Sequence, residues 1–270
     1  MTTSASGPGL TTISVGEGGE TREIAVLHRP ATGTRAPQLV WLGGYRSDMT
    51  GTKAIEMDHL AEELGCAALR FDYSGHGQSG GEFRLGTISR WLEETLAVID
   101  AYAAEEVVLV GSSMGGWIAL RLVQELRRRA AGPRVHRMLL IAPAPDFTSD
   151  LIEPALTEAE QRSLEERGYF EEASEYSPEP NIFTRALIED GRNNRVLQGM
   201  IDTGCPVHIL QGMRDEDVPY RHALKLVEFL PADDVVLTLV RDGDHRLSRP
   251  QDIERMRKAI LALIGTELPH

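Results

Sequence analysis

A serine near the middle of the chain stands in a context typical of a catalytic nucleophile. The segment Gly111-Ser112-Ser113-Met114-Gly115 follows the apolar run Val107–Val110 and leads into the helical pattern Trp117–Leu126. Only Ser113 has a glycine both two residues before it and two residues after it. A serine on a sharp strand-to-helix turn needs such glycines, because larger side chains would crowd the turn. We therefore predict that Ser113 is a nucleophile for acyl transfer.

A serine hydroxyl is a weak nucleophile at neutral pH and needs a histidine base oriented by an acid. The histidines after Ser113 are His136, His208, His222, His245 and His270. His245 lies in a turn directly after the apolar run Val235–Val240, where a base could reach the serine. The others precede or lie inside predicted strands and helices, or end the chain. We expect His245 to be the base.

The acid that orients the base is expected between the serine and the histidine in chain order. Asp215 lies in the turn that follows the apolar run Val207–Leu210, and Asp217 is its nearest competitor. Asp242 and Asp244 flank His245 too closely in sequence to orient its ring well. We predict Asp215 as the acid.

The oxyanion formed when the serine attacks a carbonyl group needs two backbone N–H donors. One is expected from Met114, the residue after the nucleophile. The second is expected from the loop after Leu39–Leu42, where Gly43-Gly44-Tyr45 would let the backbone approach a ligand closely. We assign this second donor to Tyr45, with Gly44 one register away as the alternative.

The elements that must position these residues follow an alternating pattern. Amphipathic helical stripes, such as the one from Ile88 to Ala103, lie between short apolar runs that have the length of strands buried on both faces. Two alternating segments, Thr11–Gly16 and Arg22–Arg29, are typical of short edge strands. This order predicts a doubly wound α/β fold with a mostly parallel sheet covered by helices on both faces. The apolar runs are Leu39–Leu42, Ala67–Phe71, Val107–Val110, Met138–Ile141, Val207–Leu210 and Val235–Val240.

One segment interrupts the alternation, because more than 60 residues separate Ile141 from Val207. From Asp150 to Asp190 there are 12 acids and 3 bases, a net charge of −9 out of −13 for the whole chain. We predict that residues 146–199 form an acidic helical cap over the carboxyl ends of the strands, inserted into a core made of residues 1–145 and 200–270. The alternative is an acidic decoration without a ligand role.

Composition excludes several classes of protein. A net charge of −13 over 270 residues would repel nucleic acid. No apolar run reaches the roughly 18 residues of a membrane span, and the first 20 residues do not form a signal peptide, so we expect a cytoplasmic protein. Cys66 and Cys205 are too few for a disulfide framework or a structural zinc site. Gly75-His76-Gly77-Gln78-Ser79-Gly80 matches a dinucleotide motif, but no helix opens at its third glycine, so no cofactor or metal is expected.

Together these motifs resemble the α/β-hydrolase superfamily over residues 39–264. More narrowly, Gly44-Tyr45-Arg46-Ser47-Asp48-Met49, Arg70-Phe71-Asp72-Tyr73-Ser74-Gly75 and the Ser113 segment are similar to the abhydrolase-domain-protein-ten type. That type comprises palmitoyl-protein thioesterases and acyl-glucuronide esterases, together with bacterial relatives. The resemblance implies the α/β-hydrolase fold and a triad of Ser113, Asp215 and His245.

The expected function is therefore hydrolysis of esters or thioesters of small-to-medium apolar acyl groups through an acyl-enzyme on Ser113. The substrate would be a small molecule or an acylated protein. A peptidase or acyltransferase on the same triad, or a receptor that kept the fold with little turnover, are the alternatives. The acidic insertion would disfavour polyanionic leaving groups such as coenzyme A by charge repulsion. The oligomeric state stays open.

Overall fold

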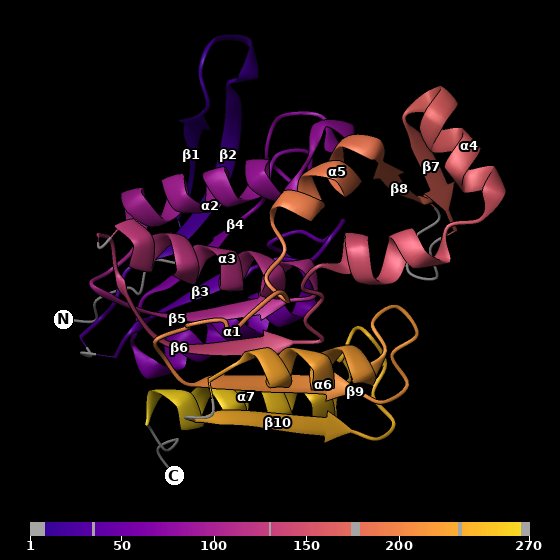
Figure 1. The fold of residues 1–270 in the computed structure, drawn as a ribbon. Coiled ribbons are helices and arrows are strands. Elements are labelled where there is room, and N and C mark those ends of the chain that lie inside the picture. The colour runs from indigo at the N-terminus through magenta and orange to yellow at the C-terminus, as the bar shows by residue number, and fades with distance from the viewer. Residues whose placement is uncertain (1–8, 34–35, 130, 174–178, 232–233, 266–270) are drawn as a thin grey trace.

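The fold is built on an eight-stranded sheet whose strands run in the order β1-β2-β4-β3-β5-β6-β9-β10 (Figure 1). The computed structural model describes residues 9–33, 36–129, 131–173, 179–231 and 234–265. The strands are β1 (Gly9–Val15), β2 (Arg22–Arg29), β3 (Gln38–Leu42), β4 (Ala68–Phe71), β5 (Glu106–Ser112), β6 (Arg134–Ile141), β9 (Val207–Gly212) and β10 (Val235–Val240).

The sheet is parallel from β4 to β10, and the antiparallel strands β2 and β1 extend it at one edge. Every predicted strand is present, because apolar runs buried on both faces have no other stable position. Strand β10 departs from that expectation. It forms an edge of the sheet, and 48% of Val236 and 39% of Leu239 remain exposed. The apolar run predicted the strand but not its position at the edge of the sheet.

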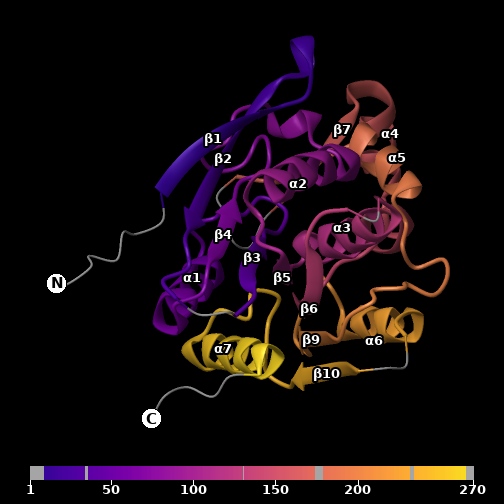
Figure 2. The same cartoon turned by 90° about the vertical axis from the view of Figure 1, so that its left-hand side faces the viewer.

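Helices cover both faces of the sheet, as the alternation predicted. Helices α1 (Thr52–Leu64) and α7 (Pro250–Ile264) pack on one face, and α2 (Ile88–Tyr102), α3 (Met114–Arg129) and α6 (Tyr220–Phe229) pack on the other (Figure 2). Each face has its own apolar cluster, so the central strands are enclosed on both sides. The carboxyl ends of the parallel strands are thereby held as one rigid edge.

The segment between β6 and β9 lies beyond the carboxyl ends of the strands (Figure 1). It contains a π-helical turn (Thr148–Ile152), a 3-10 turn (Glu153–Ala155), α4 (Glu158–Arg167) and α5 (Arg185–Asn193). Between these helices lies a hairpin of β7 (Tyr169–Glu172) and β8 (Asn181–Thr184), which the sequence pattern did not predict. Four-residue strands are too short to show a clear period of two.

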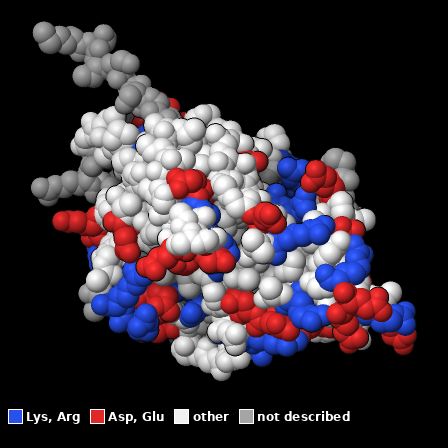
Figure 3. Space-filling view, turned by 90° about the horizontal axis from the view of Figure 1, so that it is seen from above, with Lys and Arg blue, Asp and Glu red and all other residues white. Residues whose placement is uncertain are grey.

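The surface carries charges of both signs. The basic run at the end of α3 is ion-paired, with Arg127 on Asp202 at 2.6 Å and Arg129 on Asp100 at 3.1 Å. On the face seen from above, acidic and basic side chains are interspersed beside a mostly uncharged area (Figure 3). None of the described helices combines the length and apolar character needed to cross a bilayer.

Candidate active site

Ser113 occupies the tight turn between β5 and α3. Its φ is +53°, a conformation that residues other than glycine adopt rarely and mostly where the surroundings impose it. The Ser113 N–H donates to Ile141 O at 2.9 Å, and the Gly116 N–H donates to Ser113 O at 2.9 Å. These bonds fix the turn at the carboxyl end of the sheet.

The two flanking glycines are required by close backbone contacts. A Cβ atom on Gly111 would lie 2.5 Å from the carbonyl oxygen of Gly115. A Cβ atom on Gly115 would lie 2.0 Å from the carbonyl oxygen of Leu42, at the end of β3. The glycine spacing in the sequence therefore reflects helix α3 lying directly against the strand ends.

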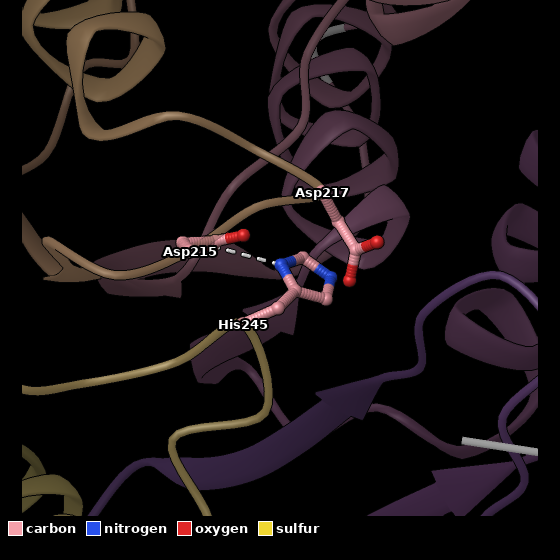
Figure 4. A group of neighbouring side chains, drawn as sticks. All are labelled: Asp215, Asp217 and His245. Atoms are coloured by element: carbon pink, nitrogen blue, oxygen red, sulfur yellow. Dashed lines mark hydrogen bonds and ion pairs between the residues drawn. The ribbon is translucent and has the colours of Figure 1, made fainter. Parts of the chain in front are cut away.

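Ser113, His245 and Asp215 form one chain of hydrogen bonds. The Ser113 Oγ lies 3.1 Å from His245 Nε2. His245 Nδ1 lies 2.9 Å from Asp215 Oδ2 (Figure 4). His245 comes from the loop after β10, and Asp215 comes from the turn after β9. A carboxylate on Nδ1 favours the tautomer with its proton there, which leaves Nε2 free to accept the serine proton.

Asp215 and Asp217 differ in how they are held. The Asp215 carboxylate is fully buried and accepts from Val218 N at 2.7 Å and from Gln211 Nε2 at 2.9 Å, besides His245. Asp217 is exposed, and its side chain lies on the opposite side of the imidazole (Figure 4). The fixed carboxylate is the one placed to orient the ring.

The carboxylates of Asp215 and Asp217 and the His245 ring could also attract a cation. Their candidate ligand atoms lie within 4.8 Å of one another. Both Asp215 oxygens already accept N–H donors, so a cation would compete with the bond that orients His245.

The other histidines serve different contacts. His208 Nε2 lies 2.9 Å from Thr238 Oγ1, and His222 Nε2 donates to Pro145 O at 2.7 Å. Burial lowers the pKa of both imidazoles. His136 lies on β6, and His270 lies outside the described residues. Among the described histidines only His245 is hydrogen-bonded to Ser113.

The loop after β3 adjoins the serine. A Cβ atom on Gly44 would lie 3.3 Å from Ser113 Cβ. The Gly44 N–H already donates to Ser47 Oγ at 2.9 Å. The N–H groups of Tyr45 and Met114 have no acceptor among the described residues. This pattern favours Tyr45 over Gly44 as the second oxyanion donor.

Sequence reasoning missed one residue that supports this loop. His76 Nε2 accepts the Arg46 N–H at 3.2 Å, and its Nδ1 lies 3.1 Å from Ser74 O. Burial lowers the pKa of His76 to about 4, so the imidazole is neutral and can accept that N–H. No local signal could have paired His76 with a residue 30 positions away.

The eight-stranded, mostly parallel sheet covered by helices on both faces is the architecture of an alpha/beta hydrolase. The chain belongs to the alpha/beta hydrolase family, whose model matches residues 27–258. The family predicted from the sequence motifs is thereby confirmed.

Among curated proteins, the chain is similar to mitochondrial palmitoyl-protein thioesterase ABHD10. The mouse protein is 32% identical over 220 residues, which cover 81% of this chain and 72% of that protein. The human protein is 30% identical over 231 residues, which cover 85% of this chain and 74% of that protein.

Solved structures show the same likeness. A putative hydrolase from Agrobacterium vitis S4 matches with a TM-score of 0.94 and 70% identity, covering 95% of this chain and 99% of that chain. Mouse alpha/beta hydrolase domain-containing protein 10 matches with a TM-score of 0.81 and 29% identity, covering 95% and 98% respectively.

Proposed function

We propose that the chain is a serine hydrolase that cleaves thioesters or carboxylic esters of small-to-medium apolar acyl groups. The observation that carries the proposal is the unbroken chain of hydrogen bonds from Ser113 Oγ through His245 to the buried Asp215. The thioesterase name of the curated relatives supports the same bond class. The cytoplasmic location stays a prediction, and those relatives are named as mitochondrial.

In the first half-reaction, His245 Nε2 takes the Ser113 hydroxyl proton as Oγ attacks the acyl carbon. Asp215 holds the imidazole in position and stabilises the imidazolium. The developing oxyanion accepts from the Tyr45 and Met114 N–H groups. When the tetrahedral intermediate collapses, the C–S or C–O bond breaks, and the leaving group takes the proton from His245 Nε2.

In the second half-reaction, water replaces the leaving group. His245 Nε2 takes one water proton, and the hydroxide oxygen attacks the carbonyl carbon of the acyl-serine. The second tetrahedral intermediate breaks its bond to Ser113 Oγ, which recovers the proton from His245. The products are a carboxylic acid and the thiol or alcohol, so the reaction balances with substrate and water alone.

Several carboxylates lie near the triad, and their charge is expected to affect which leaving groups the site accepts. Burial raises the pKa of Glu172 on β7, and the neighbouring carboxylates of Glu160 and Asp217 raise it further. Asp217 in turn adjoins His245 (Figure 4). Acids from α4, β7 and the turn after β9 are thus close enough to interact with one another, and Asp217 is the one that lies beside the imidazole. They would repel the phosphates of coenzyme A but not a neutral thiol.

The proposal is tested by presenting one medium-chain acyl group as a thioester, an oxygen ester and an acyl glucuronide. We expect kcat for at least one of them to exceed the rate constant of its uncatalysed hydrolysis by many orders of magnitude. Ser113→Ala serves as the blank. A thioester preference well beyond the uncatalysed ratio assigns a deacylating thioesterase, and the reverse preference assigns a carboxylesterase. Turnover equal to that of Ser113→Ala would refute the proposal.

A fluorophosphonate probe tests the nucleophile without a substrate. Intact mass should show one adduct on the wild type and none on Ser113→Ala. Equal labelling of both proteins would mean that another serine reacts. An unlabelled wild type, under conditions that label known serine hydrolases, would favour the receptor alternative.

The charge argument is tested with two thioesters of the same acyl group. The leaving group of acyl-coenzyme A carries phosphates, an adenosine and a pantoyl group, and N-acetylcysteamine carries none of these, so the salt dependence isolates the contribution of charge. We expect the neutral thioester to have the higher kcat/KM at low salt, and we expect added salt to narrow the gap. Acyl-coenzyme A as the better substrate at low salt would contradict the argument.

A further inference from the structure

Two consecutive residues of the loop after β3 are hydrogen-bonded to the cap hairpin. The Tyr45 hydroxyl donates to the carbonyl oxygen of Ile182, and Arg46 Nη1 donates to the carbonyl oxygen of Pro180 at 2.8 Å. Arg46 Nη2 also lies 2.7 Å from Glu179 Oε2. The residues that carry and flank the candidate oxyanion donor thus contact a segment more than 130 positions away.

These contacts lie at β8 and at the two residues directly before it. The carbonyl oxygens of Pro180, directly before the strand, and of Ile182 within it both accept hydrogen bonds from the loop. The Tyr45 ring also stacks on Phe183, with centroids 5.3 Å apart and an interplanar angle of 8°. Burial raises the pKa of the Tyr45 phenol, so the hydroxyl keeps its proton and donates it. The hairpin is seated on the loop by both polar and aromatic contacts.

The core holds the same loop from the other side. The Arg46 N–H donates to the neutral His76, and Ser47 Oγ donates to Gly44 O at 3.0 Å. Arg46 has a φ of +56°, so its backbone keeps this conformation only while several contacts impose it. One residue is therefore bonded to the core through its backbone and to the cap through its side chain. The Tyr45 N–H lies one peptide unit before it.

We propose that the Tyr45 hydroxyl and the Arg46 guanidinium are positioning groups that couple the seating of hairpin β7–β8 to the alignment of the Tyr45 N–H. The inference rests on the proposed function, because it concerns the donor that would bind the oxyanion. Acyl groups that fit beneath the seated hairpin meet an aligned donor. An acyl group that displaces the hairpin also displaces the Tyr45 N–H from its oxyanion. The coupling would therefore distinguish between substrates by their kcat.

The test uses Tyr45→Phe, which keeps the ring but removes the hydroxyl, and Arg46→Met, which keeps the length but removes the donor. Each variant is compared with the wild type for kcat and KM on an ester of a medium-chain acid. The affinity for a trifluoromethyl ketone with the same chain is measured as well, because this ketone forms a tetrahedral adduct with the serine. Thermal unfolding of each variant identifies those that fail to fold.

A matched control removes a cap contact that does not involve the loop. The Arg84 guanidinium lies 4.1 Å from the centre of the Tyr169 ring on β7 and 3.8 Å from Glu171. Arg84→Met therefore removes a contact of the same hairpin but leaves in place the two hydrogen bonds from Tyr45 and Arg46 that seat it on the loop. Arg46→Lys, which retains a cationic donor, is the conservative variant that should recover part of the lost rate.

We expect Tyr45→Phe and Arg46→Met to lower kcat by about tenfold or more, since complete loss of one oxyanion donor costs about 10²–10³. The KM should change by less than about threefold, and the affinity for the ketone should fall by the same factor as kcat. Arg84→Met should keep kcat within about twofold.

Three results would count against the coupling. If both loop variants keep the wild-type kcat and ketone affinity in an active enzyme, the coupling is wrong and the proposed function stands. If Arg84→Met lowers kcat equally, the effect belongs to the cap in general and not to the loop. If the wild type turns over no ester and forms no adduct, the proposed function fails, and the inference fails with it.

Discussion

Replacing Asp215 by asparagine should abolish most of the activity while leaving the fold intact. In the wild type, Asp215 Oδ1 accepts the Val218 N–H and Oδ2 accepts from His245 Nδ1 and Gln211 Nε2. In the variant the amide oxygen must continue to accept the hydrogen bond from the Val218 N–H. The amide NH₂ group then takes the Oδ2 position and faces His245 Nδ1.

The NH₂ group would donate to Nδ1 and so favour the tautomer with its proton on Nε2. That tautomer cannot accept the Ser113 proton, although the imidazole stays 3.1 Å from Oγ. A wrong tautomer in a triad costs about 10⁴ in kcat. At 1.36 kcal/mol per factor of ten, this is about 5 kcal/mol of transition-state stabilisation.

The same NH₂ group would face the NH₂ group of Gln211. The Gln211 Oε1 atom has no hydrogen-bond partner, so the side-chain amide can rotate to accept from the new asparagine. Rotation gives up the bonds from Gln211 Nε2 to Gly212 O and Val218 O, both at 3.1 Å. We expect a loss of about 1–2 kcal/mol in unfolding free energy, too little to unfold the protein.

The assay is kcat for a medium-chain ester, with urea unfolding as the measure of stability. Asp217→Asn is the matched control, because it makes the same change two residues away on an exposed side chain. We expect Asp217→Asn to change kcat by less than about threefold. If Asp217→Asn is the inactive variant and Asp215→Asn is active, the tautomer reasoning is refuted. The orienting acid would then be Asp217.

Three further changes have expected outcomes. Gly115→Ala places a Cβ atom 2.0 Å from Leu42 O, so we expect it to lower the melting temperature and slow fluorophosphonate labelling; unchanged values would show that the turn can relax. Burial lowers the pKa of His76 from 6.5 to about 4, so the native state binds fewer protons than the unfolded chain. Stability should therefore fall by about 3 kcal/mol as pH falls from 6.5 to 4, and urea unfolding of His76→Gln should lack this part of the pH dependence. Glu94→Gln removes one partner of a buried ion pair with Arg22 and should lower the free energy of unfolding, measured in urea, by about 3 kcal/mol. A decrease below about 1 kcal/mol would mean that the pair contributes little to stability.

The parts of the fold that the sequence predicted are those determined by local pattern. Apolar runs such as Val107–Val110 predicted strands because a chain segment buried on both faces must be apolar throughout. Ser113, Asp215 and His245 could be proposed because each lies in a turn directly after such a run. Parallel strands then bring their carboxyl ends together, so three local signals imply one site.

What the sequence could not predict depends on contacts between distant segments. The edge position of β10 follows from the order of strands, and the run Val235–Val240 is as apolar as a central strand. The ring of Phe183 in the hairpin stacks on the ring of Tyr45, which lies far away in the sequence. The contact between His76 and Arg46 joins two loops, and neither loop carries a local sign of the other.

Backbone strain marks the same edge of the sheet as the side chains do. Among the described residues, six non-glycine residues have a positive φ, and five of them follow strands of the parallel sheet at their carboxyl ends. These are Arg46 after β3, Ser113 after β5, Ala142 and Asp146 after β6, and Leu247 after β10. Such conformations cost about 1–3 kcal/mol each and persist only where the surroundings impose them. The apolar clusters on both faces of the sheet supply that constraint. The concentration of strain around Ser113 and His245 is therefore an argument for a working site that does not depend on likeness to any relative.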